Sequence, residues 1–225
     1  MSGRMRRIAE RLYPPPLFLN TGSRLEVFLA RWAKPARVVE VGAGNRRYRP
    51  DVVNLDMKPD PAVDLVCSAE RLALRSDSID AVFSTAVLEH VENDQDMVKE
   101  IHRIVRPDGE VYVEIPFLSR YHECPADYRR LTLPGLRHLF GSFEEVESGV
   151  CVGPASALAE MTQEFLASFT DHATAKKTIR FVAGWLLQPV KLLDLVLARK
   201  KTAHLSAYGV YFWGRKKREE SRKSC

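Results

Sequence analysis

The sequence predicts an α/β fold in which a mostly parallel sheet of seven strands carries helices on both faces. Short β-rich runs alternate with helical or turn segments along the first two thirds of the chain, which is typical of a parallel sheet covered by helices. A long, largely helical stretch at 155–205 predicts a helical insert before the last strand. With 225 residues, of which 45% are hydrophobic, the chain is long enough to bury such a core.

The elements are expected in a regular order. A first helix begins near Asn20 and ends before Pro35. Strands are expected at 37–42, 52–56, 63–66, 79–84, 110–115, 144–152 and 208–213, and helices at 94–105, 134–140 and through most of 155–200. Pro107-Asp108-Gly109 is expected to form the turn into the fifth strand, and Pro189 to kink the late helical stretch.

Charge and composition suggest three parts: a basic N-terminal arm at 1–21, a single folded domain at 22–214, and a basic tail at 215–225. The domain contains a helical insert or lid at 155–205. The formal net charge is +5, yet residues 12–175 contain 25 acidic and only 17 basic side chains. A nucleic-acid enzyme more often has a basic patch around its site, so no nucleic-acid partner is expected.

The four cysteines, Cys67, Cys124, Cys151 and Cys225, show no spacing typical of a zinc module or a disulfide framework. No metal site is therefore expected. This cysteine pattern fits a reducing compartment, and the first residues do not resemble a cleavable signal peptide. We expect a cytoplasmic location.

A candidate ligand site lies where the first three strands end. Gly42 and Gly44 follow the first strand, where glycines let the backbone approach a ligand at the carboxyl edge of the sheet. Asp56 ends the second strand, and its carboxylate can accept both hydroxyls of a ribose. Ser68 follows the third strand. Each has a structural alternative: a turn glycine, a turn-forming or capping Asp56, and a helix N-cap at Ser68.

The spacing favours a cofactor without phosphate over a dinucleotide. A dinucleotide fingerprint has a third glycine and an acidic residue about 20 residues further on. Here Asn45, Arg46 and Arg47 follow Gly44, and Asp56 comes only 14 residues after Gly42. The first crossover is therefore too short for a full helix whose N-terminus would bind a pyrophosphate.

Two further runs carry a family resemblance. The run 78–91, SIDAVFSTAVLEHV, resembles the fourth-strand motif of class I S-adenosylmethionine-dependent methyltransferases, and the run 100–109, EIHRIVRPDG, resembles the helix and turn that precede their fifth strand. The resemblance covers 36–152 and the closing strand near 208–214. It is to the methyltransferase type 11 family, and in particular to a subgroup with a shortened first crossover that is often found in glycan-related pathways. It implies a Rossmann-like fold and S-adenosylmethionine as the cofactor.

The resemblance also implies roles for individual residues. The first motif holds the methionine part of the cofactor, the end of the second strand holds the ribose, the next loop edges the adenine, and the segment after the fourth strand lines the cofactor and acceptor pocket. By position, the cofactor-binding residues are Glu40, Gly42, Gly44, Asp56, Met57, Ser68, Ala69, Thr85 and Glu89. The family usually has an acid at position 68, so the contact from Ser68 is expected to be weaker.

Methyl transfer to a hydroxyl requires a base, and histidine is the natural candidate near neutral pH. His122 is the preferred base, with Asp127 orienting it or binding an acceptor hydroxyl. His90 is the second candidate, or else a packed residue of a first helical turn. Acceptor contacts are expected from Tyr121, Tyr128 and Arg130. The structural alternative is a loop held together by an ion pair between Asp127 and Arg130.

These features predict O-methylation of a sugar, a glycan intermediate or a small hydroxylated metabolite. A quinone or lipid-like acceptor, and a cofactor-binding scaffold without catalysis, are the alternatives. The segment 176–201 is apolar on more than one face and rich in basic residues, but too polar to span a membrane easily. A contact with the inner face of a membrane, a lid and a homodimer contact all remain open for it.

Overall fold

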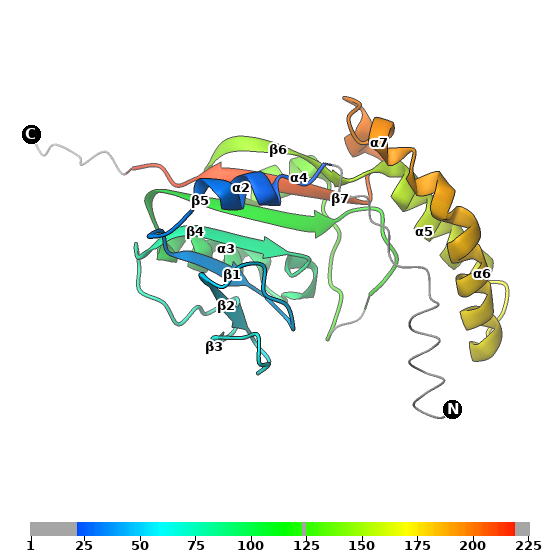
Figure 1. Cartoon of the computed structure of the whole chain (residues 1–225), viewed down its shortest axis with the longest axis horizontal. Coiled ribbons are helices and arrows are strands. Elements are labelled where there is room, and N and C mark those ends of the chain that lie inside the picture. The colour runs from blue at the N-terminus through cyan, green and yellow to red at the C-terminus, as the bar shows by residue number, and fades with distance from the viewer. Residues whose placement is uncertain (1–21, 123–124, 219–225) are drawn as a thin grey trace, which may run out of the picture. The chain divides into compact units, whose positions relative to one another are not determined.

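The structure is a computed structural model that describes residues 22–122 and 125–218 (Figure 1). The basic arm expected at 1–21 and residues 219–225 of the tail lie outside the described residues. The chain divides into two compact units. The helical unit contains Gly22, 118–120 and 150–209, and the sheet unit contains 23–117, 121–149 and the described residues from 210 onward.

The predicted seven-stranded sheet is confirmed. The strands are β1 (Val38–Val41), β2 (Val52–Asp56), β3 (Leu65–Val66), β4 (Ile79–Thr85), β5 (Val105–Pro116), β6 (Glu144–Val152) and β7 (Gly209–Arg215). Their order in the sheet is β3-β2-β1-β4-β5-β7-β6. β1 pairs in parallel with both β2 and β4, and β4 pairs in parallel with β5. The start of β5 lies beside the end of β7, where Asp108 and Gly109 exchange backbone hydrogen bonds with Lys216, so the two strands run in opposite directions.

Two strands differ from the expected bounds. β5 begins at Val105, and the expected turn at Pro107-Asp108-Gly109 is an irregularity inside the strand, where the register with β4 shifts between Ile79 and Ala81. β3 contains only Leu65 and Val66; just before it, Asp64 bonds to Asn54 of β2 through its backbone N–H (2.9 Å) and its carboxylate, which accepts the Asn54 N–H (2.8 Å).

Helices cover both faces of the sheet, as the alternation of side chains along β7 shows. These helices are α2 (Leu25–Arg31), α3 (Asp94–Ile104) and α4 (Leu133–Leu139). Phe28 of α2 packs on Trp213, whereas Phe140, at the end of α4, stacks on the adjacent Phe212. Neighbouring residues of a strand point to opposite faces, so α2 and α4 lie on opposite sides of the sheet. His102 of α3 contacts Phe143, which places α3 on the α4 side.

The first crossover contains no helix, as its short length predicts. Residues 42–51, all of them described, form turns and irregular structure. Arginine side chains organise this loop instead. Arg47 donates to the carbonyl of Val52 (2.8 Å), and Arg49 donates to the carbonyls of Leu29 (2.6 Å) and Trp32 (2.7 Å) at the end of α2. These bonds satisfy carbonyls at the end of α2, where the carbonyl of Leu29 also accepts the Trp32 N–H (3.2 Å).

The helical unit confirms the predicted helical character of 155–205. It contains α5 (Pro154–Ala167), α6 (Ala173–Lys191), α7 (Asp194–Leu197) and the short 3-10 helix η2 (Ala203–Leu205). Pro189 lies in the last turn of α6, which continues to Lys191. Among the described residues, none of the helices has the length and apolarity needed to cross a membrane.

Glu110 connects α2, β5 and β7 in the core of the sheet unit. Its side chain is 1% exposed and accepts hydrogen bonds from Trp32 (3.2 Å), Trp213 (3.0 Å) and the guanidinium of Arg215 (2.9 Å). Arg31 of α2 donates to the same carboxylate (3.2 Å). One buried charge thereby fixes a helix and the last strand to the middle of the sheet.

Replacing Glu110 by alanine is expected to lower the free energy of unfolding by about 2–4 kcal/mol, because the buried indole N–H groups lose their acceptor. Urea titration followed by circular dichroism measures this loss. Glu144→Ala, at an exposed position on β6, is the matched control and should leave the free energy nearly unchanged. Equal stability of both variants would contradict a central role for Glu110.

Candidate functional site

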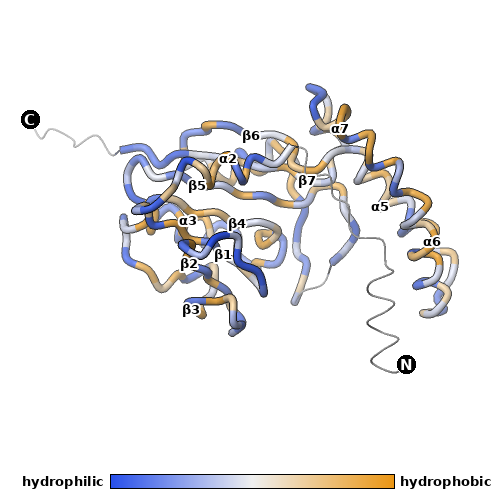
Figure 2. Tube along the Cα trace, in the orientation of Figure 1, coloured by the Kyte–Doolittle hydropathy of each residue, from blue (hydrophilic) through white to orange (hydrophobic). Residues whose placement is uncertain are grey.

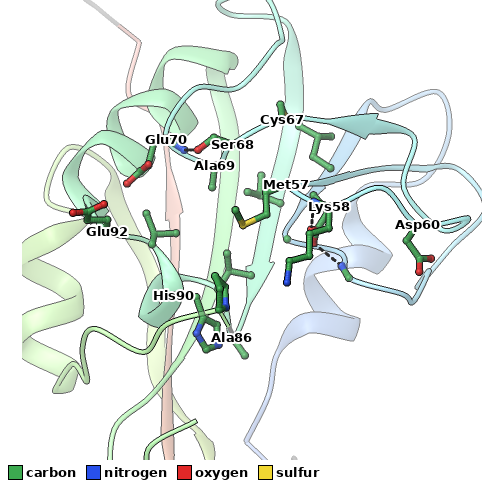
Figure 3. Close-up of a pocket in the computed structure, with 18 of the residues that line it drawn as sticks. Met57, Lys58, Asp60, Cys67, Ser68, Ala69, Glu70, Ala86, His90 and Glu92 are labelled. Carbon is green, nitrogen blue, oxygen red and sulfur yellow. Dashed lines mark hydrogen bonds between the residues drawn. The ribbon is translucent and has the colours of Figure 1, made fainter. Parts of the chain in front are cut away.

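A cavity of about 610 Å³ lies within the sheet unit, at the carboxyl edge of β1, β2 and β4 (Figure 3). The loops that follow these strands and β3 form most of its wall, and residues of the segment 122–128 complete it. This is the edge at which open α/β sheets bind ligands, beside the point where the strand order reverses. Of the predicted cofactor-binding residues, the cavity wall contains Gly42, Gly44, Asp56, Met57, Ser68 and Ala69.

The two glycines of the first motif are required for different reasons. Gly42 has a φ of +80°, and a Cβ at this position would lie 2.2 Å from Cγ2 of Val87. Gly44 has a φ of +59° but open space around it. A side chain at Gly42 would therefore both strain the backbone and collide, whereas one at Gly44 would meet only the backbone strain.

Asp56 organises the first two loops and still has acceptor capacity left. Its Oδ2 accepts the Gly44 N–H (2.9 Å), and its Oδ1 accepts the Lys58 N–H (2.9 Å). Each carboxylate oxygen can accept a second hydrogen bond, so the side chain remains able to bind two hydroxyls. Ser68 accepts the Glu70 N–H (3.2 Å) in a local turn, and no helix begins there, so Ser68 is not the helix N-cap that was its structural alternative.

Glu40 is a buried carboxylate that has no hydrogen-bond partner among the described residues. It lies in β1 directly before the cavity-lining Val41 and Gly42, and it is 0% exposed. Burial raises the pKa of Glu40 to about 7, an effect that the nearby charges of Arg46 and Arg47 partly offset. A buried carboxylate with both oxygens open is suited to a cationic ligand group, such as the ammonium of an amino acid.

Three predicted cofactor-binding residues lie outside the cavity wall, namely Glu40, Thr85 and Glu89. Thr85 is buried and accepts a hydrogen bond from Arg46 Nη2 (2.9 Å). Glu89 is 4% exposed, and burial raises the pKa of its carboxyl group. Its backbone carbonyl accepts the N–H of Tyr128 (2.7 Å). Thr85 and Glu89 are not among the residues of the cavity wall, and their role in cofactor binding stays a prediction.

Arg46 was missed by the sequence reasoning. Besides its bond to Thr85, its guanidinium lies over the ring of Tyr48 (5.3 Å) and close enough to lower the pKa of Glu40. The signal that could have found it is its place in the shortened loop, two residues after Gly44, where a helix would otherwise stand. Arg46 is therefore a second charged group, of opposite sign to Glu40, at the end of the first motif.

His90 and His122 meet at the cavity wall, with ring centroids 5.7 Å apart. His90 belongs to the 3-10 helix η1 (Leu88–His90), and its Nδ1 lies 2.5 Å from the carbonyl oxygen of Ala126. A carbonyl can only accept, so Nδ1 carries the proton of the neutral ring and Nε2 has the lone pair. His90 is thus fixed in the tautomer that a base at Nε2 requires.

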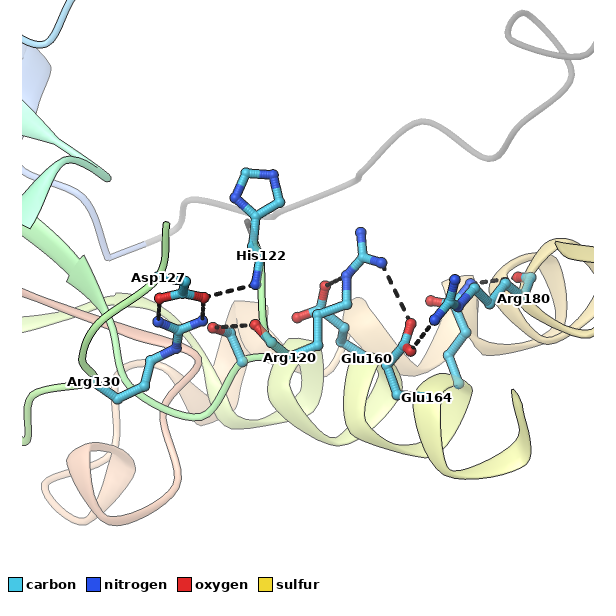
Figure 4. Close-up of polar contacts among 9 residues, drawn as sticks. Arg120, His122, Asp127, Arg130, Glu160, Glu164 and Arg180 are labelled. Atoms are coloured by element: carbon cyan, nitrogen blue, oxygen red, sulfur yellow. Dashed lines mark hydrogen bonds and ion pairs between the residues drawn. The ribbon is translucent and has the colours of Figure 1, made fainter. Parts of the chain in front are cut away.

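Asp127 does not orient the imidazole of His122, contrary to the prediction. Its carboxylate accepts the backbone N–H of His122 (2.6 Å) and forms a two-pronged ion pair with Arg130 (Figure 4). Burial opposes ionisation of Asp127, but its hydrogen bonds with Arg130 and His122 outweigh burial and lower its pKa. Asp127 and Arg130 hold the loop together, which was the structural alternative. Arg130 is therefore engaged by Asp127 rather than open to an anionic acceptor.

The two predicted aromatic contacts differ in position. Tyr128 lines the cavity and is 52% exposed, whereas Tyr121 is 66% exposed and lies outside the cavity wall. The cavity wall also contains Lys58, Asp60 and Glu92, which the sequence did not single out. Their signal was weak because charged residues in loops are most often solvated surface residues.

Comparisons with known proteins agree with this geometry. Residues 39–113 match the family described as a methyltransferase domain. The solved structure of the [4+2]-cyclase SpnF is similar, with a TM-score of 0.54 and 16% identity over 87% of this chain and 82% of that chain. A comparison with curated protein sequences gives no match.

Two similar structures contain the cofactor or its product. Haemonchus contortus phosphoethanolamine N-methyltransferase 2, in complex with S-adenosyl-L-methionine, has a TM-score of 0.52 and 15% identity over 86% of this chain and 52% of that chain. Burkholderia thailandensis 1,6-didemethyltoxoflavin-N1-methyltransferase, with bound 1,6-didemethyltoxoflavin and S-adenosylhomocysteine, has a TM-score of 0.52 and 17% identity over 96% of this chain and 83% of that chain.

The chain therefore has the class I methyltransferase fold, and residues 39–113 match the model of a methyltransferase domain. S-adenosylmethionine, the cofactor that the sequence predicts, is bound in the first of these two structures. The residues present fit this molecule, because the open carboxylate of Glu40 matches its ammonium group and the remaining acceptor sites of Asp56 match its ribose hydroxyls.

Asp56→Ala is expected to weaken binding of S-adenosylmethionine by about 1–3 kcal/mol, roughly 5- to 150-fold, because a charged acceptor of the ribose hydroxyls is lost. Isothermal titration calorimetry measures the affinity, and a thermal melt confirms that the variant folds. Asp171→Ala, at a fully exposed carboxylate of the helical unit, is the control and should bind like the wild type. Unchanged binding by Asp56→Ala would remove the ribose role.

Glu40 predicts a pH dependence of cofactor binding. Burial raises the pKa of Glu40 to about 7, and the ammonium group of the cofactor favours the ionised carboxylate. At a pH below this pKa, binding must therefore also remove a proton from Glu40. Affinity for S-adenosylhomocysteine, which keeps the amino-acid end, should rise between about pH 6 and about pH 8 and then level off. Glu40→Gln should bind more weakly and without this rise. A flat wild-type profile would show that the ammonium does not meet Glu40.

Proposed function

We propose that this protein transfers the methyl group of S-adenosylmethionine to a hydroxyl group of a sugar, a glycan intermediate or a small hydroxylated metabolite. The observation that carries this proposal is the fixed tautomer of His90 at the cavity wall, with Nδ1 held by the carbonyl of Ala126. A hydroxyl acceptor must lose a proton during transfer, and a neutral imidazole protonated at Nδ1 can take it at Nε2. The Nε2 of His90 lies 3.8 Å from the carboxylate of Glu89.

The cofactor supplies a methyl group on a positively charged sulfur, and the protein must bring the acceptor oxygen in line with it. The residues of the cavity divide this task. Glu40 and Asp56 hold the two ends of the cofactor, His90 removes the acceptor proton, and Tyr128 offers an aromatic face on which a sugar ring can stack.

The wall near His90 is rich in hydrogen-bonding groups, which favours a polyhydroxylated acceptor. His122 and Glu92 line the cavity together with His90 and Tyr128. Figure 3 shows His90 and Glu92. Several polar groups at one wall of a largely apolar pocket are the usual means of fixing a polar ligand's orientation. We assign His122 to acceptor binding, because no contact to its imidazole holds it in a base-competent tautomer comparable to that of His90 among the described residues.

A quinone or lipid-like acceptor is the second candidate, and the exposed apolar side chains of the helical unit favour it. A cofactor-binding protein that does not transfer methyl groups is the third candidate. The similarity to a [4+2]-cyclase favours it, since the same fold hosts different activities. We also infer a cytoplasmic location, because the spacing of the four cysteines is not that of a disulfide framework.

His90→Gln is expected to lower the rate of methyl transfer about 100- to 10,000-fold, because the acceptor hydroxyl loses its base. Release of S-adenosylhomocysteine is measured over a panel of monosaccharides, glycan intermediates and quinols. His122→Gln is the matched comparison: as an acceptor ligand it should raise KM more than it lowers kcat.

The outcomes separate the candidates. A larger loss of kcat in His122→Gln than in His90→Gln would exchange the roles of the two histidines. Turnover of quinols alone would favour the lipid-like acceptor. Tight cofactor binding with no turnover on any acceptor of the panel would favour the cofactor-binding scaffold.

A further inference from the structure

The helical unit exposes large apolar side chains along its outer surfaces. Phe165 is 62% exposed, Phe169 is 75% exposed and Leu186 is 73% exposed. Leu158 and Met161 continue the same row on α5, and Figure 2 shows apolar residues recurring along α6 and α7. Apolar surface of this extent on a folded protein usually marks a binding surface.

The polar side chains of the same helices lie between them. Glu160 accepts from Arg120 (3.1 Å), and Glu164 accepts from Arg180 of α6 (2.6 Å) (Figure 4). Gln163 donates to the backbone carbonyl of Arg180. Positions 160, 163 and 164 follow helical spacing, so one side of α5 carries the ion pairs and faces α6.

The apolar row of α5 lies on its other side. Leu158, Met161 and Phe165 also follow helical spacing, but they are rotated away from Glu160 and Glu164. A helix pair in water normally buries its apolar side and exposes its charges. Here the Glu164–Arg180 ion pair joins α5 to α6, the buried apolar positions of α5 are alanines, and the large apolar residues face outward. Such a pair is matched to an apolar environment rather than to water.

A buried cap fixes the start of α5. The carboxylate of Asp194 is 0% exposed and accepts the N–H groups of Ala155 (2.8 Å) and Ser156 (2.9 Å) together with the Ser156 hydroxyl (2.7 Å). Gly153 leaves the space for this carboxylate, since a Cβ there would lie 2.2 Å from Asp194 Oδ1. The start of α5 is therefore tied to α7, and the outward direction of the apolar row is built into the fold.

The exposed charges of this unit are mostly positive. Lys177 lies near the start of α6, and Arg199, Lys200 and Lys201 follow α7. Among residues 150–209, Glu160, Glu164 and Asp194 are paired or buried, which leaves Asp171 as the exposed acidic side chain. Outward apolar rows flanked by cations complement a surface that combines hydrocarbon with negative charge.

We propose that the helical unit binds the surface of an anionic phospholipid bilayer, with Phe165, Phe169 and Leu186 inserted among the acyl chains and Arg199–Lys201 on the phosphate layer. The lengths and charges of α5 and α6 suit an interfacial position. A membrane-bound site would have access to lipid-linked acceptors, but the binding itself is independent of the proposed methyl transfer.

The test is co-sedimentation of the full chain with vesicles of phosphatidylglycerol and phosphatidylcholine, and with vesicles of phosphatidylcholine alone. The wild type should bind the anionic vesicles, bind neutral ones at least about tenfold more weakly, and lose binding as salt is raised. The double variant Phe165→Ser and Phe169→Ser should weaken binding by about tenfold or more, because it lacks the two rings that insert among the acyl chains.

A charge variant keeps the test valid if the apolar variant fails to fold. Arg199→Gln, Lys200→Gln and Lys201→Gln together leave every apolar position intact and should weaken binding to anionic vesicles by about tenfold or more. Val27→Ser, at a 43% exposed position of α2, is the matched control in the sheet unit and should bind like the wild type. Circular dichroism checks the fold of each variant.

Three results would overturn the proposal. The first is a folded wild type that does not bind anionic vesicles at low salt. The second is binding that neither the apolar nor the charge variant changes. The third is a wild-type dimer in sedimentation velocity that the Phe165 and Phe169 changes dissolve while vesicle binding is absent, because a second copy of the chain would then cover the apolar rows.

Discussion

The candidate site depends on the parallel pairing of β1 with both β2 and β4. This pairing brings three loops to one edge of the sheet and fixes their relative heights. The carbonyl of Leu55 in β2 accepts the N–H groups of both Gly42 (2.8 Å) and Ala43 (3.0 Å), so the first loop is bonded to the second strand before any ligand arrives. Asp56 then ties the same two loops together through Gly44. The loops of the ligand site are thus preorganised by hydrogen bonds before a ligand binds.

The shortened first crossover changes how charge is arranged at this edge. A helix N-terminus would place partial positive charge there, but here three arginines occupy the loop. Arg47 and Arg49 bind backbone carbonyls and support the loop, whereas Arg46 bonds to Thr85, which lies outside the cavity wall. Unlike the end of a helix, the charged groups of arginine side chains can change position. Their electrostatic effect at this edge depends on the carboxylates nearby. The pKa of Glu40 shows this coupling, since burial raises it and Arg46 pulls it back.

The sequence was sufficient to predict the sheet, because continuous β-rich runs and the glycines and prolines between them are local signals. The bounds of β2 and β6 are as predicted, and the first cofactor motif lies in the cavity wall. Contacts between distant residues were not predictable in the same way. Whether Asp127 reaches the ring or the backbone of His122 depends on loop geometry, and whether Thr85 lines or supports the wall depends on where the side chain of Arg46 lies. The same limit applies to the helical unit, where composition indicated an amphipathic segment but not that its ion pairs lie between the helices.

The strand order has a consequence for how the chain folds. β7 lies between β5 and β6 in the sheet, although all of the residues from 153 to 208 separate it from β6 along the chain. Until residues 209–215 are in place, β5 and β6 each have an unpaired edge, and β6 has no neighbour in the sheet. Assembly of this half therefore requires closure of a long loop, which makes it the slow step and the one most exposed to aggregation. During synthesis on the ribosome, the half with β1 to β4 can form early. β6 has no partner strand until β7 is synthesised, and we expect chaperones to bind it in that interval.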